Sequence, residues 1–70
     1  MINSKFIVIN GKLFNAAYIS SIKKISDDIE QEYFIRVENA INNSYDDVYY
    51  NAAFKRDDDY NRILQELTNN

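Results

Sequence analysis

The spacing of apolar residues changes along the chain, and the change separates a predicted helix from predicted strands. Near the C-terminus the apolar residues recur at i, i+3, i+4 and i+7, which forms one stripe on a helix. These residues are Tyr60, Ile63, Leu64 and Leu67. We therefore predict a helix over Asp57–Leu67, packed through this stripe. The run Asp57, Asp58 and Asp59 is predicted to cap its first turn, where carboxylates favour the free N–H groups.

The N-terminal part of the chain predicts a β-hairpin. Lys5–Ile9 is predicted to be a strand, and because both of its faces are apolar we expect it to be central or buried on both sides. Asn10 and Gly11 form the strongest short hairpin signal, since a type I′ turn needs positive φ at both positions. Lys12 begins the return strand.

Two stretches after the hairpin leave alternatives open. Asn15–Ala17 fits a bend, a bulge or one helical turn. In Tyr18–Ser26 the isoleucines recur every three residues, which fits neither the helix nor the strand period. The β-branched content and the Ser-Asp-Asp ending favour a strand, and a short amphipathic helix is the alternative.

The two clearest strands lie in the middle of the chain. Glu32–Ala40 follows a predicted loop at Asp27–Gln31, and Asp47–Phe54 follows a predicted turn at Asn42–Ser44. We predict one α+β domain over residues 1–70, with a four-stranded antiparallel sheet (β-β-β-β-α) and the helix on one face. The side chains expected beneath the helix are Tyr33, Ile35, Val37, Val48, Tyr50 and Phe54.

The composition argues against an enzyme. The chain has no cysteine and no histidine, so it lacks a thiolate, an imidazole base and the usual zinc ligands. Its one glycine lies in the predicted hairpin and cannot form a phosphate-binding loop. The paired carboxylates have no calcium-loop spacing and suit turns and caps. We predict a non-enzymatic protein with no cofactor and no metal site.

The other face of the predicted sheet is the candidate interface. A small domain without disulfides has limited core, which favours association with a second copy. Phe34, Tyr49 and Arg36 alternate out of phase with the residues beneath the helix, so they are the predicted contact residues. A homodimer is the first interpretation of this face. A different, unidentified protein and stacked single-stranded bases are the alternatives.

Charge is distributed unevenly along the chain, whose net charge is −3. Residues 1–26 carry four lysines and no acid, whereas residues 27–59 carry ten acids and three bases. The unlike charges fit a solvated surface, or an acidic face that a basic partner or a nucleic-acid-binding enzyme recognises. Net negative charge makes nucleic-acid binding an unfavoured function. The candidate acidic face comprises Asp27, Asp28, Glu30, Asp46, Asp47, Asp57, Asp58 and Asp59.

The segment KFIVINGKLFN, followed by YISSI, resembles the opening of small sheet-plus-helix proteins of low-GC bacteria and their phages. The resemblance carries no catalytic motif and implies a sheet with a helix and no activity. In size and acidity alone, the chain is also similar to phage inhibitors of nucleases and CRISPR effectors. The apolar run at Phe6–Ile9 is too short for a signal-peptide core or a membrane span, so we expect a cytoplasmic protein.

Overall fold

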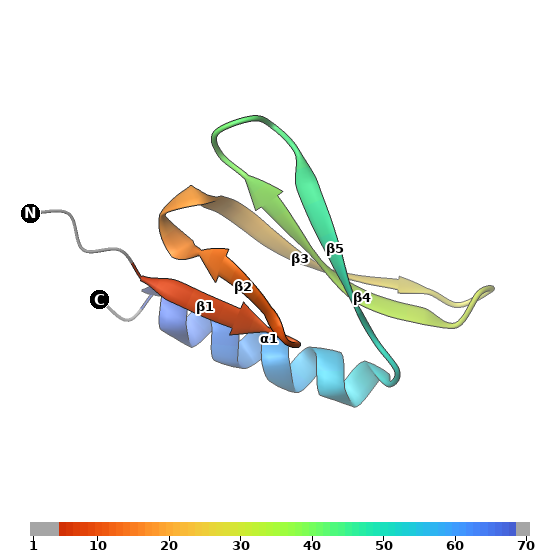
Figure 1. Ribbon diagram of the computed structural model, residues 1–70. Coiled ribbons are helices and arrows are strands. Elements are labelled where there is room, and N and C mark those ends of the chain that lie inside the picture. The colour runs from red at the N-terminus through yellow and green to blue at the C-terminus, as the bar shows by residue number, and fades with distance from the viewer. Residues whose placement is uncertain (1–4, 69–70) are drawn as a thin grey trace, which may run out of the picture.

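The computed structural model describes residues 5–68 and confirms an α+β fold with one C-terminal helix packed against strands (Figure 1). The elements are β1 (Phe6–Ile9), β2 (Lys12–Asn15), the 3-10 turn η1 (Ala16–Tyr18), β3 (Ile19–Asp27), β4 (Glu32–Asn39), β5 (Tyr45–Tyr50) and α1 (Ala53–Thr68). The strand prediction for Tyr18–Ser26 is therefore confirmed to within a residue at each end, and its helical alternative is wrong.

The strands form two antiparallel sheets, so the prediction of a single four-stranded sheet is wrong. One sheet pairs β1 with β2, and the other has the order β3-β4-β5. The separation begins at η1, the one helical turn that the sequence left open. The Asn15 side chain accepts from the backbone N–H of Ala17 at 3.0 Å, and Ala16 N donates to the Lys5 carbonyl at 2.8 Å. This turn ends the hairpin and redirects the chain into β3.

The hairpin has the predicted turn, but β1 is not a central strand. Asn10 has φ of 47° and Gly11 has φ of 86°, as a type I′ turn requires. Among residues 5–68, strand β1 pairs only with β2, and its alternate residues face opposite environments. Ile7 and Ile9 are buried in the core, whereas Phe6 and Val8 are 55% and 51% exposed.

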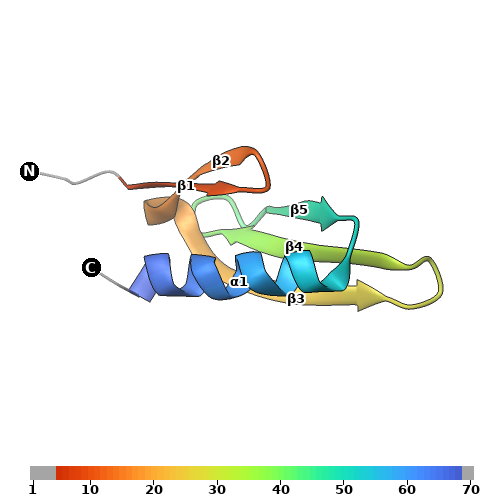
Figure 2. The same cartoon turned by 90° about the horizontal axis from the view of Figure 1, so that it is seen from below.

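The core lies between α1 and the inner faces of both sheets. Helix α1 lies against strands of both sheets, an arrangement that Figure 2 shows from below. In the three-stranded sheet, register pairs Ile22 with Val37 and Ile35 with Val48, so all four side chains share the inner face. Ile63 packs on them from the helix, and all of these side chains are 9% exposed or less.

Helix α1 begins at Ala53, before the predicted start at Asp57, and β5 ends at Tyr50 instead of Phe54. The chain bends after Tyr50, and Arg56 N donates to the Ala52 carbonyl at 3.3 Å in the first helical turn. Phe54 consequently lies on the helix and is 65% exposed, so its predicted place beneath the helix is wrong. The run of aspartates lies beyond the first turn, and its predicted capping role is also wrong.

The buried stripe of α1 keeps three of the predicted residues, since Ile63 is in the core and Tyr60 and Leu67 pack against it, and it also includes a charged residue. Ile63 is fully buried, Leu64 is 38% exposed, and Arg56 is only 7% exposed. The Arg56 guanidinium donates to the Ile25 carbonyl at 2.9 Å, to Ser26 Oγ at 2.6 Å and to the adjacent Asp57 carboxylate. A buried charge is costly unless it is paired and hydrogen-bonded, and Arg56 meets both conditions.

A second polar network fastens α1 to β5 and β1. The Tyr50 hydroxyl donates to Asp59, which also accepts from Arg62, and Arg62 donates to the Val8 carbonyl at 2.6 Å. Burial and the hydrogen bond to Asp59 raise the pKa of Tyr50. Burial opposes ionisation of Asp59, but the hydrogen bonds from Tyr50 and Arg62 hold its pKa below the usual range. Both shifts favour a neutral phenol beside a carboxylate.

Candidate protein-interaction face

The face of the β3-β4-β5 sheet that points away from α1 carries the predicted interface residues. Register places Phe34 between Ile25 and Tyr49 in one cross-strand row, and Arg36 between Lys23 and Asp47 in the next. The third row, Ser21, Glu38 and Tyr45, completes a patch that we call the outer face.

Side chains on the outer face hold one another in position. The Phe34 and Tyr49 rings lie 4.8 Å apart between centroids and are tilted by 35°. The guanidinium carbon of Arg36 lies 4.2 Å from the Tyr45 ring centroid and 5.8 Å from that of Phe34. Arg36 also donates to both carboxylate oxygens of Asp47, at 2.8 and 3.1 Å. This planar, two-bond contact fixes the guanidinium against the aromatic rings.

The exposed members of the outer face are tyrosines. Phe34 is 7% exposed, because Tyr49 and Arg36 lie against it, so it supports the face and offers little contact area. Tyr49 and Tyr45 are 50% and 55% exposed. The sequence-based prediction therefore names a supporting residue, Phe34, and omits Tyr45. The sequence does contain a signal for Tyr45, because Tyr45, Asp47 and Tyr49 occupy alternate positions, as residues on one face of a strand do.

The cations on the outer face have acidic partners. The hydrogen bond from Arg36 to Asp47 raises the arginine pKa, although burial opposes the shift. Lys23 Nζ lies 3.4 Å from a Glu38 carboxylate oxygen. A hydrogen bond from Ser21 and the contact with Lys23 lower the Glu38 pKa, against a smaller opposing effect of burial. The outer face thus carries charges of both signs close together.

The structure does not gather the predicted acidic residues onto one face. Asp27, at the end of β3, accepts from the backbone N–H groups of residues 29 and 30, each at 3.1 Å, and so shapes its own turn. Asp47 is on the outer face and Asp46 on the inner face of β5. Asp57 and Asp59 pair with Arg56 and with Arg62 on the helix. The remaining members lie on exposed turn and helix positions, namely Asp28, Glu30 and Asp58.

Two further properties concern residues 5–68 only. Within that range, no helix is long and apolar enough to cross a membrane. The same residues contain no group of three or more acidic, cysteine or histidine side chains that could hold a metal ion.

Comparisons of this chain with protein-family models, with curated proteins and with solved structures find no match.

Proposed function

We propose that this protein is a non-enzymatic protein-interaction module that forms a homodimer through the outer face and acts by occupying a partner protein. The observation that supports the proposal is the pair of half-exposed tyrosines, Tyr45 and Tyr49, held in place by Arg36 and Phe34. Tyrosine and arginine are the residue types that contribute most often to binding energy at interfaces.

Pre-organisation of the outer face favours binding. A side chain that is mobile before binding loses about 0.5–1.5 kcal/mol of entropy when an interface immobilises it. Tyr49 already rests on Phe34, and Tyr45 already stacks beneath a guanidinium that Asp47 holds through two hydrogen bonds. These side chains therefore lose less conformational entropy when a partner binds.

A second copy is the partner that the charge pattern favours first. The outer face carries Lys23 and Arg36 together with Glu38 and Asp47. A two-fold axis can place cations of one copy over anions of the other, while the exposed tyrosines meet. A small domain without disulfides also gains more from a covered sheet face than a large one does.

The other functions considered from the sequence receive less support. Single-stranded nucleic acid needs free cations beside the aromatic rings, and Arg36 and Lys23 are paired with acids. An acidic inhibitor that imitates nucleic acid needs its carboxylates on one surface, whereas Asp46, Asp47 and Asp59 belong to different surfaces and two of them are in ion pairs.

Light scattering tests the proposed homodimer. We expect the wild-type protein to approach twice the chain mass of 8.3 kDa as its concentration rises towards the millimolar range. A double variant, Tyr45→Ser with Tyr49→Ser, is expected to remain at the monomer mass. The matched control is Phe6→Ser with Val8→Ser, which removes side chains of similar exposure from β1 and should leave the dimer intact. A wild-type monomer throughout, or a control that dissociates equally, contradicts the proposal.

A further inference from the structure

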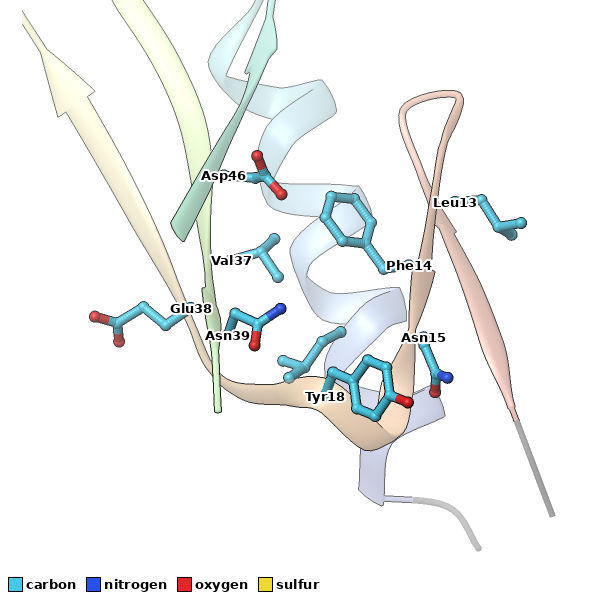
Figure 3. A pocket seen from close by; sticks show the side chains of 9 residues that line it. Leu13, Phe14, Asn15, Tyr18, Val37, Glu38, Asn39 and Asp46 are labelled. Atoms are coloured by element: carbon cyan, nitrogen blue, oxygen red, sulfur yellow. The ribbon is translucent and has the colours of Figure 1, made fainter. Parts of the chain in front are cut away.

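A groove separates the two sheets along the facing edges of β2 and β5. Among residues 5–68, no backbone hydrogen bond joins these strands. The hairpin tip closes one end, where Asn10 Nδ2 donates to the Tyr49 carbonyl at 2.8 Å. Away from the tip, the structure contains a cavity of about 130 Å³ lined by both strands, η1 and β4 (Figure 3). Each sheet thus presents a free strand edge to the same groove.

The contact between Asn10 and Tyr49 shows which backbone groups of β5 face the groove. The Tyr49 carbonyl points out of the sheet, whereas the Ser44 carbonyl, which is out of phase with it, points inward and accepts from β4 at 2.8 Å. Backbone groups of an antiparallel edge strand alternate in this way. Asp47 and Tyr45 are in phase with Tyr49, so their N–H and C=O groups face the groove and are available to a further strand.

The groove is lined by both apolar and polar side chains, the polar ones including Asn15, Asn39 and Asp46. Phe14, Tyr18 and Val37 line the cavity, and Figure 3 shows the Asp46 carboxylate beside the Phe14 ring. Within the described residues, the Asp46 side chain makes no hydrogen bond and no ion pair. The Glu38 carboxylate, by contrast, points away from the cavity (Figure 3). An exposed anion therefore lies beside a partly apolar cavity and a free strand edge.

The charge of β5 argues against a second copy as the occupant. Pairing two β5 edges across a two-fold axis would bring Asp46 and Asp47 of both copies close together, and like charges facing each other across strands are destabilising. An inward charge on an edge strand is a known protection against such pairing. A strand that carries a lysine or an arginine is instead attracted to Asp46 and Asp47.

We propose that the groove binds an extended, basic peptide segment of a partner protein, which adds as a strand to the edge of β5. A lysine or arginine of the segment pairs with Asp46, and an apolar side chain two residues away enters the cavity, because alternate residues of a strand share a face. Val37 and Asp46, which line the cavity, lie on the inner face of the sheet, whereas the rings of Tyr45 and Tyr49 lie on the outer face. The proposal therefore goes beyond the homodimer and does not depend on it.

The experiment is selection of a displayed random-peptide library on the wild-type protein, followed by titration of the synthesised peptides. Enriched peptides should carry a basic residue two positions from an apolar one and lack proline. We expect Asp46→Asn to weaken their binding by about threefold and Asp46→Lys by about tenfold or more, as loss or reversal of one partly exposed ion pair implies. Asp58→Lys, the same charge change at an exposed helix position, is the control and should change affinity by less than about twofold.

Amide hydrogen exchange separates strand addition from other binding modes. Bound peptide should slow exchange at Tyr45 and Asp47 by about tenfold or more, because their N–H groups acquire acceptors. Tyr49→Ser should retain peptide binding even if it abolishes the homodimer, so failure of one proposal is distinct from failure of the other. The groove proposal is overturned if no peptide is enriched, if Asp46→Lys binds equally well, or if exchange at both amides is unchanged.

Discussion

Ile63 and Leu64 are adjacent on α1 but occupy different environments, and their truncation tests how the helix packs. Ile63 is fully buried against both sheets, whereas Leu64 is 38% exposed. Both substitutions to alanine remove three carbon atoms from a helical position, so each variant is the control for the other. We expect Ile63→Ala to destabilise the domain much more than Leu64→Ala.

The expected loss of unfolding free energy in each variant follows from how deeply the side chain is buried. Removing three buried carbon groups from Ile63 costs about 2.4 kcal/mol at about 0.8 kcal/mol each, and a cavity among Ile7, Ile35 and Val48 raises the total to about 3–4 kcal/mol. Leu64 retains much of its solvent contact, so its truncation should cost only about 1 kcal/mol. Alanine's higher helix propensity offsets a few tenths of a kcal/mol in the Ile63 variant and less in the Leu64 variant.

Urea denaturation followed by far-ultraviolet circular dichroism measures the difference. For a domain of this size, a dependence of about 1 kcal/mol per molar urea converts these costs to midpoint decreases of about 3 M for Ile63→Ala and about 1 M for Leu64→Ala. Equal midpoints for the two variants, or a larger decrease for Leu64→Ala, would show that α1 faces the sheets through a different stripe.

Two other perturbations test local features of the fold. A Cβ at Gly11 would have no atom within 4 Å, so Gly11→Val should destabilise the domain only because of the φ of 86° at this position. We expect urea denaturation to show a loss of about 1–2 kcal/mol in the free energy of unfolding. Asn10→Gly should cost less than about 1 kcal/mol. The folded pKa of Tyr50 is raised above the ordinary tyrosine value of about 10, so the stability it contributes is present below about pH 10 and is lost as pH rises further. Tyr50→Phe should therefore lose less stability than the wild type between about pH 9 and about pH 11, and equal losses would contradict the hydrogen bond to Asp59.

The sequence-based prediction located the regular elements where local chemistry determines them. The Asn10-Gly11 turn follows from the φ that each residue tolerates, and the alternation in β4 follows from one covered face. The helix start was wrong because Ala52 and Phe54 continue the alternation of Val48 and Tyr50 beyond the end of the strand. No strong capping residue marks Ala53 as the first helical position.

Features that depend on distant contacts were not predictable from local patterns. Arg56 precedes the helix predicted from the sequence, and its burial depends on the Ile25 carbonyl and Ser26 Oγ, which only the folded chain places nearby. The division into two sheets depends on the turn at Ala16–Tyr18, and for the overlapping stretch Asn15–Ala17 the sequence permits three conformations. Phe34 and Arg36 were placed on the correct side of the sheet, but their mutual shielding follows from the register with β5.

A dilution series of two-dimensional ¹⁵N–¹H nuclear magnetic resonance spectra tests, residue by residue, whether the outer face is an interface. Between millimolar and micromolar protein, we expect amide shifts to change with concentration around Lys23, Arg36, Tyr45 and Tyr49, while those of β1 stay constant. Spectra that do not depend on concentration would contradict self-association. Changes centred on β1 or α1 would place the interface elsewhere and contradict the assignment of the outer face.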